Sequence, residues 1–545
     1  MTASLTRKQF TSLLCPHLGG ARMSHPVRMF DRRAFLKALA ALGVSGAAPA
    51  YTQERPRFGE APFALGVASG YPTQNGFVIW TRLVTDPSLP GGGIDPVRTR
   101  VNWEVASDDK MRDVVASGVD FLVPAWAHSM HVEVEGLQPD RPYWYRFNAG
   151  NAESPIGRTR TAPPARSVPA RFRFAFASCQ HYEHGYFSAY RHILADDPDL
   201  IAFLGDYIYG RHAAKDAVRS HGSSEPKTLS RYRVRHALYK TDPDLQAAHA
   251  AVPWICTWDD HEVANDYAAD QPEDDAPLEE WVTRRLVAYK AYYEHMPLRD
   301  RMQPTAQGMR IYAQMGWGDL ARFFIVDGRQ YRTPQACPRP DSKSGANTVN
   351  VAECPQLFSP ERTLLGRRQE AWLETALELT PARWNILAQQ TLMAQLDQQP
   401  GPGRQAWTDG WDGYPVARKK LLDFIATKKT PNPVVIGGDT HTFYVADLKR
   451  DFDQAKSPVV ASEFVGTSIS SQSSWPPERM AQLLAENPHL KFADNRHRGY
   501  VRVEVTPKQW RADLRAMETV AKPDGACSTL ASFVVDDGRP GPRRI

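Results

Sequence analysis

The chain has 545 residues, which is long enough for two or more domains with a substantial core. Hydrophobic residues make up 42% and charged residues 23%, the composition of an ordinary folded soluble protein. The net charge of +5 comes from residues 1–50, which hold seven Lys and Arg and one Asp, so that 59 of the 66 basic and 60 of the 61 acidic residues follow them. This balance excludes bulk attraction to nucleic acid, and we expect no nucleic-acid partner.

The basic N-terminal segment resembles a twin-arginine export signal. An Arg32-Arg33 pair precedes an apolar stretch, and Ala48-Pro49-Ala50 provides a small-residue cleavage site. The apolar stretch is about a dozen residues long, shorter than the roughly 18 to 20 of a permanent membrane helix. We therefore predict a bacterial protein that uses the twin-arginine export machinery, has no permanent membrane span and is periplasmic or secreted. Residues 1–28 lack such a pattern, and Met29 is a more typical start.

The pattern between residues 58 and 160 predicts a small fibronectin-like β-sandwich. FALGVASG, GFVIWTRL, RVNWEVAS and MHVEVEGLQPDRPYWYRF alternate apolar and polar residues, with turn residues between them. Leu137, Pro139 and Tyr143 resemble a tyrosine corner, in which a phenol bonds back to the chain. One more hairpin of the main domain is the alternative. The following SPIGRTRTAPPARSVPA has four prolines, which predicts a linker.

After residue 170, strands alternate with polar loops and helical stretches, which indicates α/β layering. Four apolar runs end in side chains with O, N or S donors: RFRFAFASCQ, DLIAFLGDYIYG, VPWICTWDDHEVANDY and PNPVVIGGDTHTF. The donors, in chain order, are Cys179, Asp206, Tyr209, Asp259, Asp260, His261, Glu262, Asn265, Asp439 and His441. Because open α/β sheets bind ligands at the carboxyl ends of their strands, we expect these side chains to form one site.

Each of these side chains alone has an ordinary structural explanation. Cys179 could be a small buried hydrophobe, Asp206 could organise a turn, and His441 could be a satisfied core histidine. A single site explains all four strand ends better than four separate structural explanations do. Other catalytic patterns fail, because HEVAN places Asn265 where a zincin helix repeats its histidine, and the chain has no G-x-S-x-G elbow, Walker loop or convincing dinucleotide motif. The donor types favour a polynuclear metallohydrolase for phosphate esters, whose anionic oxygens need neutralising cations.

The motifs ASCQ, GDYIYG, WDDHEVANDY, GGDTHTF and RGYVRVEV, in this order, resemble the PhoD family of exported alkaline phosphatases and phosphodiesterases. The resemblance covers nearly all of the mature chain. It implies an α/β catalytic domain over residues 170–525, built as a two-sheet metallophosphatase-type sandwich flanked by helices. It also implies a metal-dependent phosphoric ester hydrolase that uses a metal-activated water on monoesters, diesters or both. Nucleic acid would be met only as a substrate.

The resemblance also implies roles for single residues. The matches to Fe3+ ligands are Cys179, Asp206, Tyr209 and His441. Asp206 would bridge to Ca2+, which Asn265 and Asp439 would also bind, with the division of Asp439 between the two ions left open. Tyr207 is expected to face away from the ions.

Three residues are candidates for catalysis. Asp260 and His261 would orient ligands or contact the phosphate. Asn265 is the third candidate, with its neighbour Asp266 as the competing match. Family members often have an acidic residue after the second tyrosine, whereas Gly210 and Arg211 follow here, and Arg211 would either face the substrate or be a solvated loop residue.

Two alternative functions remain open at this point. A phospholipase D or phosphodiesterase of the same fold would have a wider cleft that admits a second substituent. An exported phosphate-binding or surface interaction protein would turn over neither a monoester nor a diester.

The six cysteines divide by context. Cys256 lies in an apolar strand and is expected to be inert packing. Cys337 and Cys354 flank a polar stretch that could not order itself by burial, so we predict a disulfide between them in an oxidising compartment, with Cys527 as the competitor for either partner.

Overall fold

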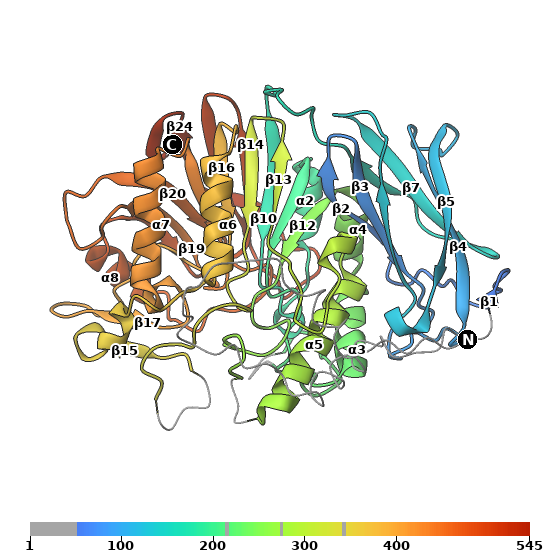
Figure 1. Cartoon of the computed structure of the whole chain (residues 1–545), viewed down its shortest axis with the longest axis horizontal. Helices are drawn as coiled ribbons and strands as arrows, with labels where there is room; N and C mark the ends of the chain where they lie inside the picture. Colours follow the sequence, from blue (N-terminus) through green and yellow to red (C-terminus); the bar gives the residue numbers. More distant parts are fainter. Residues whose placement is uncertain (1–51, 213–216, 273–275, 340–344) are drawn as a thin grey trace, which may run out of the picture.

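The computed structural model describes residues 52–212, 217–272, 276–339 and 345–545. The predicted export signal and its cleavage site lie outside the described residues. Two large β-sheets dominate the fold, and helices lie beside them (Figure 1). No helix in the described ranges is both long enough and apolar enough to span a bilayer.

The N-terminal part forms the predicted β-sandwich. One of its sheets contains β1 (Thr52–Gln53), β4 (Arg98–Ala106), β5 (Val114–Leu122), β7 (Pro142–Ala149), β8 (Ala152–Glu153) and β9 (Gly157–Arg160). Packed against this sheet are β2 (Val67–Thr73), β3 (Gly76–Arg82) and β6 (Ser129–Val134). The two layers share an apolar core to which Val67 and Ile79 contribute from one side and Val101, Tyr145 and Phe147 from the other.

The tyrosine corner is confirmed, because the Tyr143 hydroxyl accepts a hydrogen bond from the backbone N–H of Gln138 at 3.0 Å. The linker prediction is wrong in its first part. Gly157–Arg160 form strand β9, which pairs with β7. The strand was hidden because prolines flank it and because its outward positions carry arginines, one of which, Arg160, pairs with Asp140 at 2.8 Å.

The sandwich strands β2, β3 and β6 continue into the main sheet of the catalytic part. This ten-stranded sheet has the order β25-β24-β23-β22-β10-β11-β12-β2-β3-β6. Its further strands are β10 (Phe172–Ala177), β11 (Leu200–Leu204), β12 (Trp254–Thr257), β22 (Arg498–Val505), β23 (Gln509–Met517), β24 (Cys527–Asp536) and β25 (Arg539–Arg544). One sheet runs through both parts, so the strand pairing does not mark a boundary between them. The domain limits 58–160 and 170–525 therefore stay predictions.

The junction between the two parts is a single parallel pairing of Trp254 in β12 with Gly70 in β2. A Cβ atom at Gly70 would lie 2.6 Å from the carbonyl oxygen of Pro297 and 2.7 Å from that of Trp254. Only glycine allows the two strands to approach this closely.

The second large sheet has the order β13-β14-β16-β18-β20-β19-β21. Its strands are β13 (Ala313–Trp317), β14 (Ala321–Ile325), β16 (Trp384–Ala388), β18 (Pro433–Gly437), β19 (Phe443–Lys449), β20 (Val459–Val465) and β21 (Leu490–Asp494). Strands β14, β16, β18 and β20 are parallel. A shared core that includes Phe174, Phe323 and Ile436 packs this sheet against the first one.

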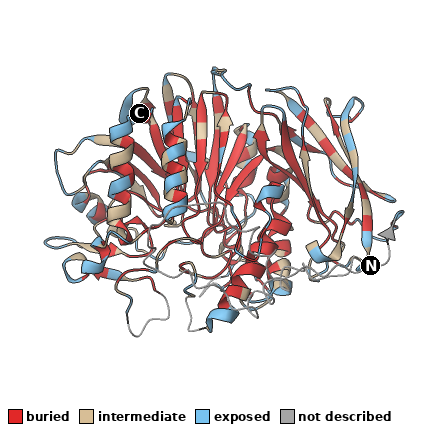
Figure 2. Ribbon diagram, viewed as in Figure 1, coloured by how far each residue is buried: buried red, intermediate tan, exposed pale blue. Residues whose placement is uncertain are grey.

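Helices cover the outer faces of both sheets, which confirms the predicted two-sheet sandwich (Figure 1). Beside the first sheet lie α2 (Ala189–Ala195), α3 (Leu229–Lys240), α4 (Pro243–Ala251) and α5 (Leu278–His295). Beside the second lie α6 (Arg367–Glu378), α7 (Pro415–Lys428) and α8 (Arg479–Glu486). The 3-10 helices are η1 (Pro124–Trp126), η2 (Tyr182–His184), η3 (Asp300–Met302), η4 (Val351–Glu353), η5 (Pro355–Phe358) and η6 (Trp411–Gly413). Buried residues run along the strands of both sheets and into the loops at their ends (Figure 2).

Cys337 and Cys354 form the predicted disulfide, and Cys256 is buried and unpaired as expected. The disulfide encloses strand β15 (Thr348–Asn350), which forms a two-stranded sheet with β17 (Gln405–Trp407). A few apolar side chains, including Val349, pack around the bridge.

We expect the double variant Cys337→Ser, Cys354→Ser to lower the free energy of unfolding by about 3 kcal/mol, because a disulfide restricts the unfolded chain. Urea unfolding of the variant and of the oxidised wild type measures the difference. Equal unfolding midpoints for the two proteins would contradict a stabilising bridge. Cys256→Ser is the control, since it removes a thiol that forms no bridge.

Candidate metal centre

The structure brings the predicted strand ends of both sheets together at one place. Strands β10, β11 and β12 supply Cys179, Asp206 and Asp259, and β18 supplies Asp439 and His441. At this place, three groups have donor atoms that all lie within 4.8 Å of one another: Cys179, Asp206 and His441; Asp206, Asp259 and Asp439; and Asp206, Asp260 and His261. Asp206 belongs to all three, and its role as a bridge between two ions stays a prediction.

The backbone at these strand ends is held in an uncommon conformation. The φ angles of Cys179, Asp206, Asp439 and His441 are 58°, 60°, 61° and 50°. Left-handed backbone in a residue other than glycine costs on the order of 1–3 kcal/mol and gathers at functional sites. Neighbouring hydrogen bonds hold the turns: the N–H of Cys179 donates to the carbonyl of Gly205 at 3.0 Å, and that of Gln180 to the carbonyl of Asp206 at 3.1 Å.

The two tyrosines of GDYIYG face in different directions. The Tyr209 hydroxyl donates to the Asp206 carboxylate at 2.7 Å and lies 3.0 Å from Nε2 of His441. The Tyr207 hydroxyl instead lies 2.9 Å from Nε2 of His249. Both phenols are buried. Because their hydroxyls have different partners, only Tyr209 contacts the donor cluster, and Tyr207 faces away from it as expected.

Burial and mutual repulsion raise the pKa of most acids in the cluster. Burial, followed by the charges of Asp260 and Asp259, raises the pKa of Asp206 well above its usual value. Burial raises the pKa of Asp439 to about 7. Burial, with Asp206 as the next cause, also raises the pKa values of the Tyr209 phenol and the Cys179 thiol. Without a cation, the protein environment disfavours the charged form of all four groups.

Several donor atoms of the cluster lack a hydrogen-bond partner among the described residues. They are Oδ1 of Asp206, Oδ2 of Asp259 and Oδ1 of Asp260, all of them buried. Buried polar atoms in native proteins are normally paired, so Oδ1 of Asp206 and Oδ2 of Asp259 call for partners that the described residues do not supply, while Oδ1 of Asp260 has an ion pair with Arg329 at 3.7 Å. A thiol, a phenol, an imidazole and clustered carboxylates form a donor set that fits transition-metal and calcium ions.

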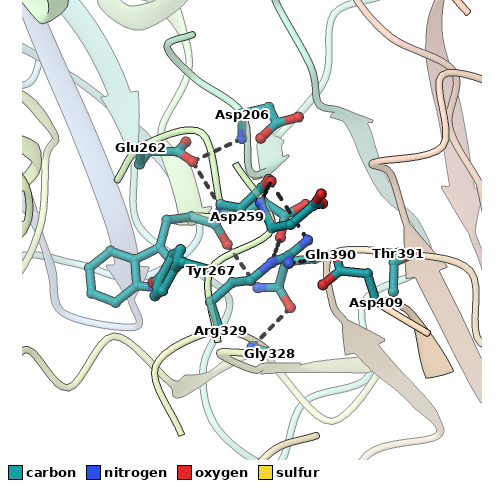
Figure 3. Close-up of polar contacts among 12 residues, drawn as sticks. Asp206, Asp259, Glu262, Tyr267, Gly328, Arg329, Gln390, Thr391 and Asp409 are labelled. Carbon is teal, nitrogen blue, oxygen red and sulfur yellow. Dashed lines mark hydrogen bonds and ion pairs between the residues drawn. The ribbon is translucent and has the colours of Figure 1, made fainter. Parts of the chain in front are cut away.

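Arg329 provides the buried positive charge next to the cluster (Figure 3). Its guanidinium pairs with Asp259, with Asp409 at 2.6 Å and with Asp260 at 3.7 Å. Although burial raises the pKa of Asp260, the charges of Arg329 and His261 bring it below its usual range. The acids next to Arg329 are therefore partly neutralised.

Glu262 joins the ends of two neighbouring strands (Figure 3). Its carboxylate accepts hydrogen bonds from the backbone N–H groups of Tyr207 at 2.6 Å, Asp206 at 3.2 Å and Asp259 at 3.0 Å. Burial raises its pKa to about 8, against the lowering effect of the backbone donors. Glu262 is one of the donors expected at the strand ends, and in the structure it holds the loops that carry Asp206 and Asp259.

Sequence reasoning missed several polar residues next to the cluster. Arg329 follows β14, and Gln390 follows β16. The Gln390 amide donates to the carbonyls of Trp258 and Val326 at 2.9 and 2.8 Å, which connects the loops of the two sheets. The signal was present, since FFIVDGRQ and NILAQQT are also apolar runs that end in polar side chains.

A cavity of about 420 Å³ opens beside the cluster. The predicted residues that line it are Asp206, Asp260, His261, Asn265, Asp439 and His441, and Asp266 lies beside them. Cys179 and Tyr209 are buried and do not line the cavity. Arg211 is exposed and does not line it either.

Comparisons with known proteins match this architecture along almost the whole chain. A family model described as PhoD-like phosphatase matches residues 174–514, and one for the N-terminal domain of PhoD-like phosphatases matches residues 46–163. The chain is 44% identical over 532 residues to alkaline phosphatase D of Bacillus subtilis (strain 168), covering 95% of this chain and 89% of that protein. It also resembles a solved structure of PhoD, with a TM-score of 0.85, 44% identity and coverage of 90% of this chain and 93% of the other.

Fold, site and comparisons define the protein as a phosphoric ester hydrolase built on a two-sheet α/β sandwich. More specifically, the chain belongs to the PhoD-like phosphatase family.

Asp206→Asn should change how the stability of the metal-free protein depends on pH. Because the folded pKa of Asp206 is raised, its contribution to the stability of the metal-free wild type should be fully present below the unfolded pKa and be lost as the pH rises towards the folded pKa. The variant lacks this titration, so at pH 8 it should be more stable than the wild type by at least about 1 kcal/mol. Thermal unfolding between pH 4 and 9 after chelation measures both curves, and parallel curves would contradict the expectation.

Proposed function

We propose that the chain hydrolyses phosphoric monoesters, diesters or both at a mixed centre of Fe3+ and Ca2+. The proposed Fe3+ ligands are Cys179, Asp206, Tyr209 and His441, and the proposed Ca2+ ligands are Asp206, Asn265 and Asp439. The observation that carries the assignment is the position of the Tyr209 hydroxyl between Asp206 and His441. A phenol loses its proton near pH 10 in water, so a cation that binds it near neutral pH must be strongly Lewis acidic, as Fe3+ is.

Side chains of the chain itself would contact the ester beside the metal ions. When bound, the cations would neutralise phosphate oxygens and lower the pKa of a water molecule. Asp260 and His261 line the cavity with donor atoms within 4.8 Å of Asp206, close enough to contact an ester held at the cluster. The backbone N–H of Asp266 donates to Asp260 at 2.6 Å and fixes that carboxylate. Burial lowers the pKa of His261 although Asp260 opposes the shift, so we propose that His261 contacts an ester oxygen as a neutral imidazole that donates a hydrogen bond.

The size of the cavity favours activity on diesters in addition to monoesters. Its volume of about 420 Å³ lies in the range of about 300–1,000 Å³ that is typical of sites for drug-sized ligands. A phosphodiesterase or phospholipase D of the same fold remains the second candidate for this reason. Membership of a phosphatase family does not support the alternative of a binding protein without turnover.

Tyr209→Phe should remove visible absorption from phenolate-to-iron charge transfer and reduce turnover of monoester and diester chromogens by at least about tenfold, as expected when metal binding is impaired. Tyr207→Phe is the matched control, because it removes an equally buried phenol that bonds a different histidine. The control should keep the band. Metal analysis of both proteins measures iron, and active wild type without iron, or an unchanged spectrum in Tyr209→Phe, would contradict the assignment of Tyr209.

We also propose export by the twin-arginine machinery to the periplasm or beyond. The Arg32-Arg33 pair supports this route, and the Cys337–Cys354 disulfide is of the kind that persists in oxidising compartments.

Purified exported protein should begin at or near Tyr51, and the double variant Arg32→Lys, Arg33→Lys should remain in the cytoplasm. N-terminal sequencing and cell fractionation measure the two outcomes. Exported material that retains residues upstream of Arg32 would argue against cleavage at Ala50.

A further inference from the structure

Apolar side chains line part of the cavity beside the donor cluster. The cavity lining includes the acids and histidines described above. It also includes an apolar part, which consists of Leu392, Leu396, Trp407, Trp411, Tyr444 and Trp475. We call Trp407, Trp411, Tyr444 and Trp475 the aromatic wall. A phosphate group held at the cluster does not need such a wall, so the wall is available to another part of the ligand.

The aromatic wall has a fixed part and a more accessible part. Trp411 and Tyr444 are buried, and the Trp411 indole N–H donates to Oε1 of Gln389 at 3.1 Å. Trp407 and Trp475 are only half-buried. The guanidinium of Arg479 lies over the ring of Trp475, 4.4 Å from its centroid, and helps to hold it. Indole rings that are held in place in this way can stack against a ring of a ligand.

The lining of the cavity offers no basic side chain for an anionic group. No Lys or Arg lines the cavity in the part of the chain that the structure describes, and the Arg479 guanidinium lies over the ring of Trp475. Asp412, a further acid of the lining, pairs with Arg418 at 2.5 Å and accepts the backbone N–H of Leu396 at 2.9 Å. A second negative group of the substrate would therefore be buried without a partner, which is costly.

The loop that is closed by the disulfide supports the wall. In the small sheet of β15 and β17, Thr348 pairs with Trp407. The backbone N–H of Asn347 also donates to the hydroxyl of Thr408 at 2.9 Å. Asn347 and Thr348, which precede Cys354, thus hold the strand of Trp407 beside the cavity.

We infer that the aromatic wall binds the organic group of the phosphoric ester, and that this group is uncharged and carries a flat or apolar surface. The inference rests on the proposed function only in that phosphorus is held at the donor cluster. One cavity includes both the cluster and the aromatic wall, so an ester with its phosphorus at the cluster can place its organic group against the wall. An ester with a ring is selected by contact with indoles, whereas an ester whose substituent carries a second phosphate or carboxylate is disfavoured.

The test measures binding, so it does not depend on turnover. Calorimetry of the metal-loaded full chain compares orthophosphate, methylphosphonate, phenylphosphonate and 4-carboxyphenylphosphonate, which are not hydrolysed. We expect phenylphosphonate to bind at least about tenfold more tightly than methylphosphonate, as for other groups that fill an apolar pocket. We expect 4-carboxyphenylphosphonate to bind more weakly than phenylphosphonate.

Substitutions in the aromatic wall test whether it causes the preference for phenylphosphonate. Trp407→Ala and Trp475→Ala should each reduce the preference for phenylphosphonate over methylphosphonate at least about threefold and leave orthophosphate affinity unchanged. Trp407→Phe and Trp475→Phe should keep most of the preference and show that the sites still fold. Trp103→Ala, which removes a half-buried indole of β4 outside the cavity, is the matched control and should keep the wild-type preference.

Equal affinity of the wild type for phenylphosphonate and methylphosphonate would overturn the inference. So would an unchanged preference in both alanine variants, or a carboxyl-bearing ring that binds as tightly as the plain ring. A protein that shows the expected binding pattern but hydrolyses no chromogenic ester would contradict the proposed function and support the subsite.

Discussion

The structure depends on a concentration of buried negative charge where the strands of two sheets end. Asp206, Asp259, Asp260 and Asp439 meet there, and Arg329 pairs with two of them. Among the described residues, no ion pair joins Asp206 or Asp439 to a basic side chain, and buried acids of this kind destabilise a fold unless a positive charge balances them. The fold therefore has to hold these acids together against their repulsion.

The chain achieves this through its backbone more than through side-chain ion pairs. Glu262 accepts three backbone N–H groups and joins the loops after β11 and β12. Gln390 connects the loops of the two sheets. The donors are thus fixed by groups that do not themselves bind the ligand, which is the arrangement that precise sites require. Thr348 of the disulfide-closed loop performs the same task for the aromatic wall, where it pairs with Trp407.

The site residues that could be predicted are those that stand in a recognisable local pattern, an apolar run followed by a polar side chain within a known motif. Cys179, Asp206, Asp439 and His441 follow apolar runs closely. The family resemblance supplied the assignment of Tyr209, with Tyr207 expected to face away. Arg329 and Gln390 follow equally apolar runs, but neither belongs to a recognised motif. Strand β9 was taken for a linker because prolines surround it. The pairing of β12 with β2 joins residues almost two hundred positions apart through a single glycine, and no local pattern reports it.

The left-handed backbone at the strand ends limits the mutations that the centre can sample. At positive φ, β-branched side chains clash with the backbone, whereas Gly, Asn, Asp and His are tolerated more readily. Substitutions of Asp206, Asp439 or His441 that the fold accepts are therefore drawn largely from residues that also donate oxygen or nitrogen, with glycine as the exception. The same restriction applies at Cys179, where φ is 58°, although cysteine is not one of the residues that tolerate this conformation most readily. Random variation at the three other positions would more often retune or delete a ligand than replace it with an apolar side chain.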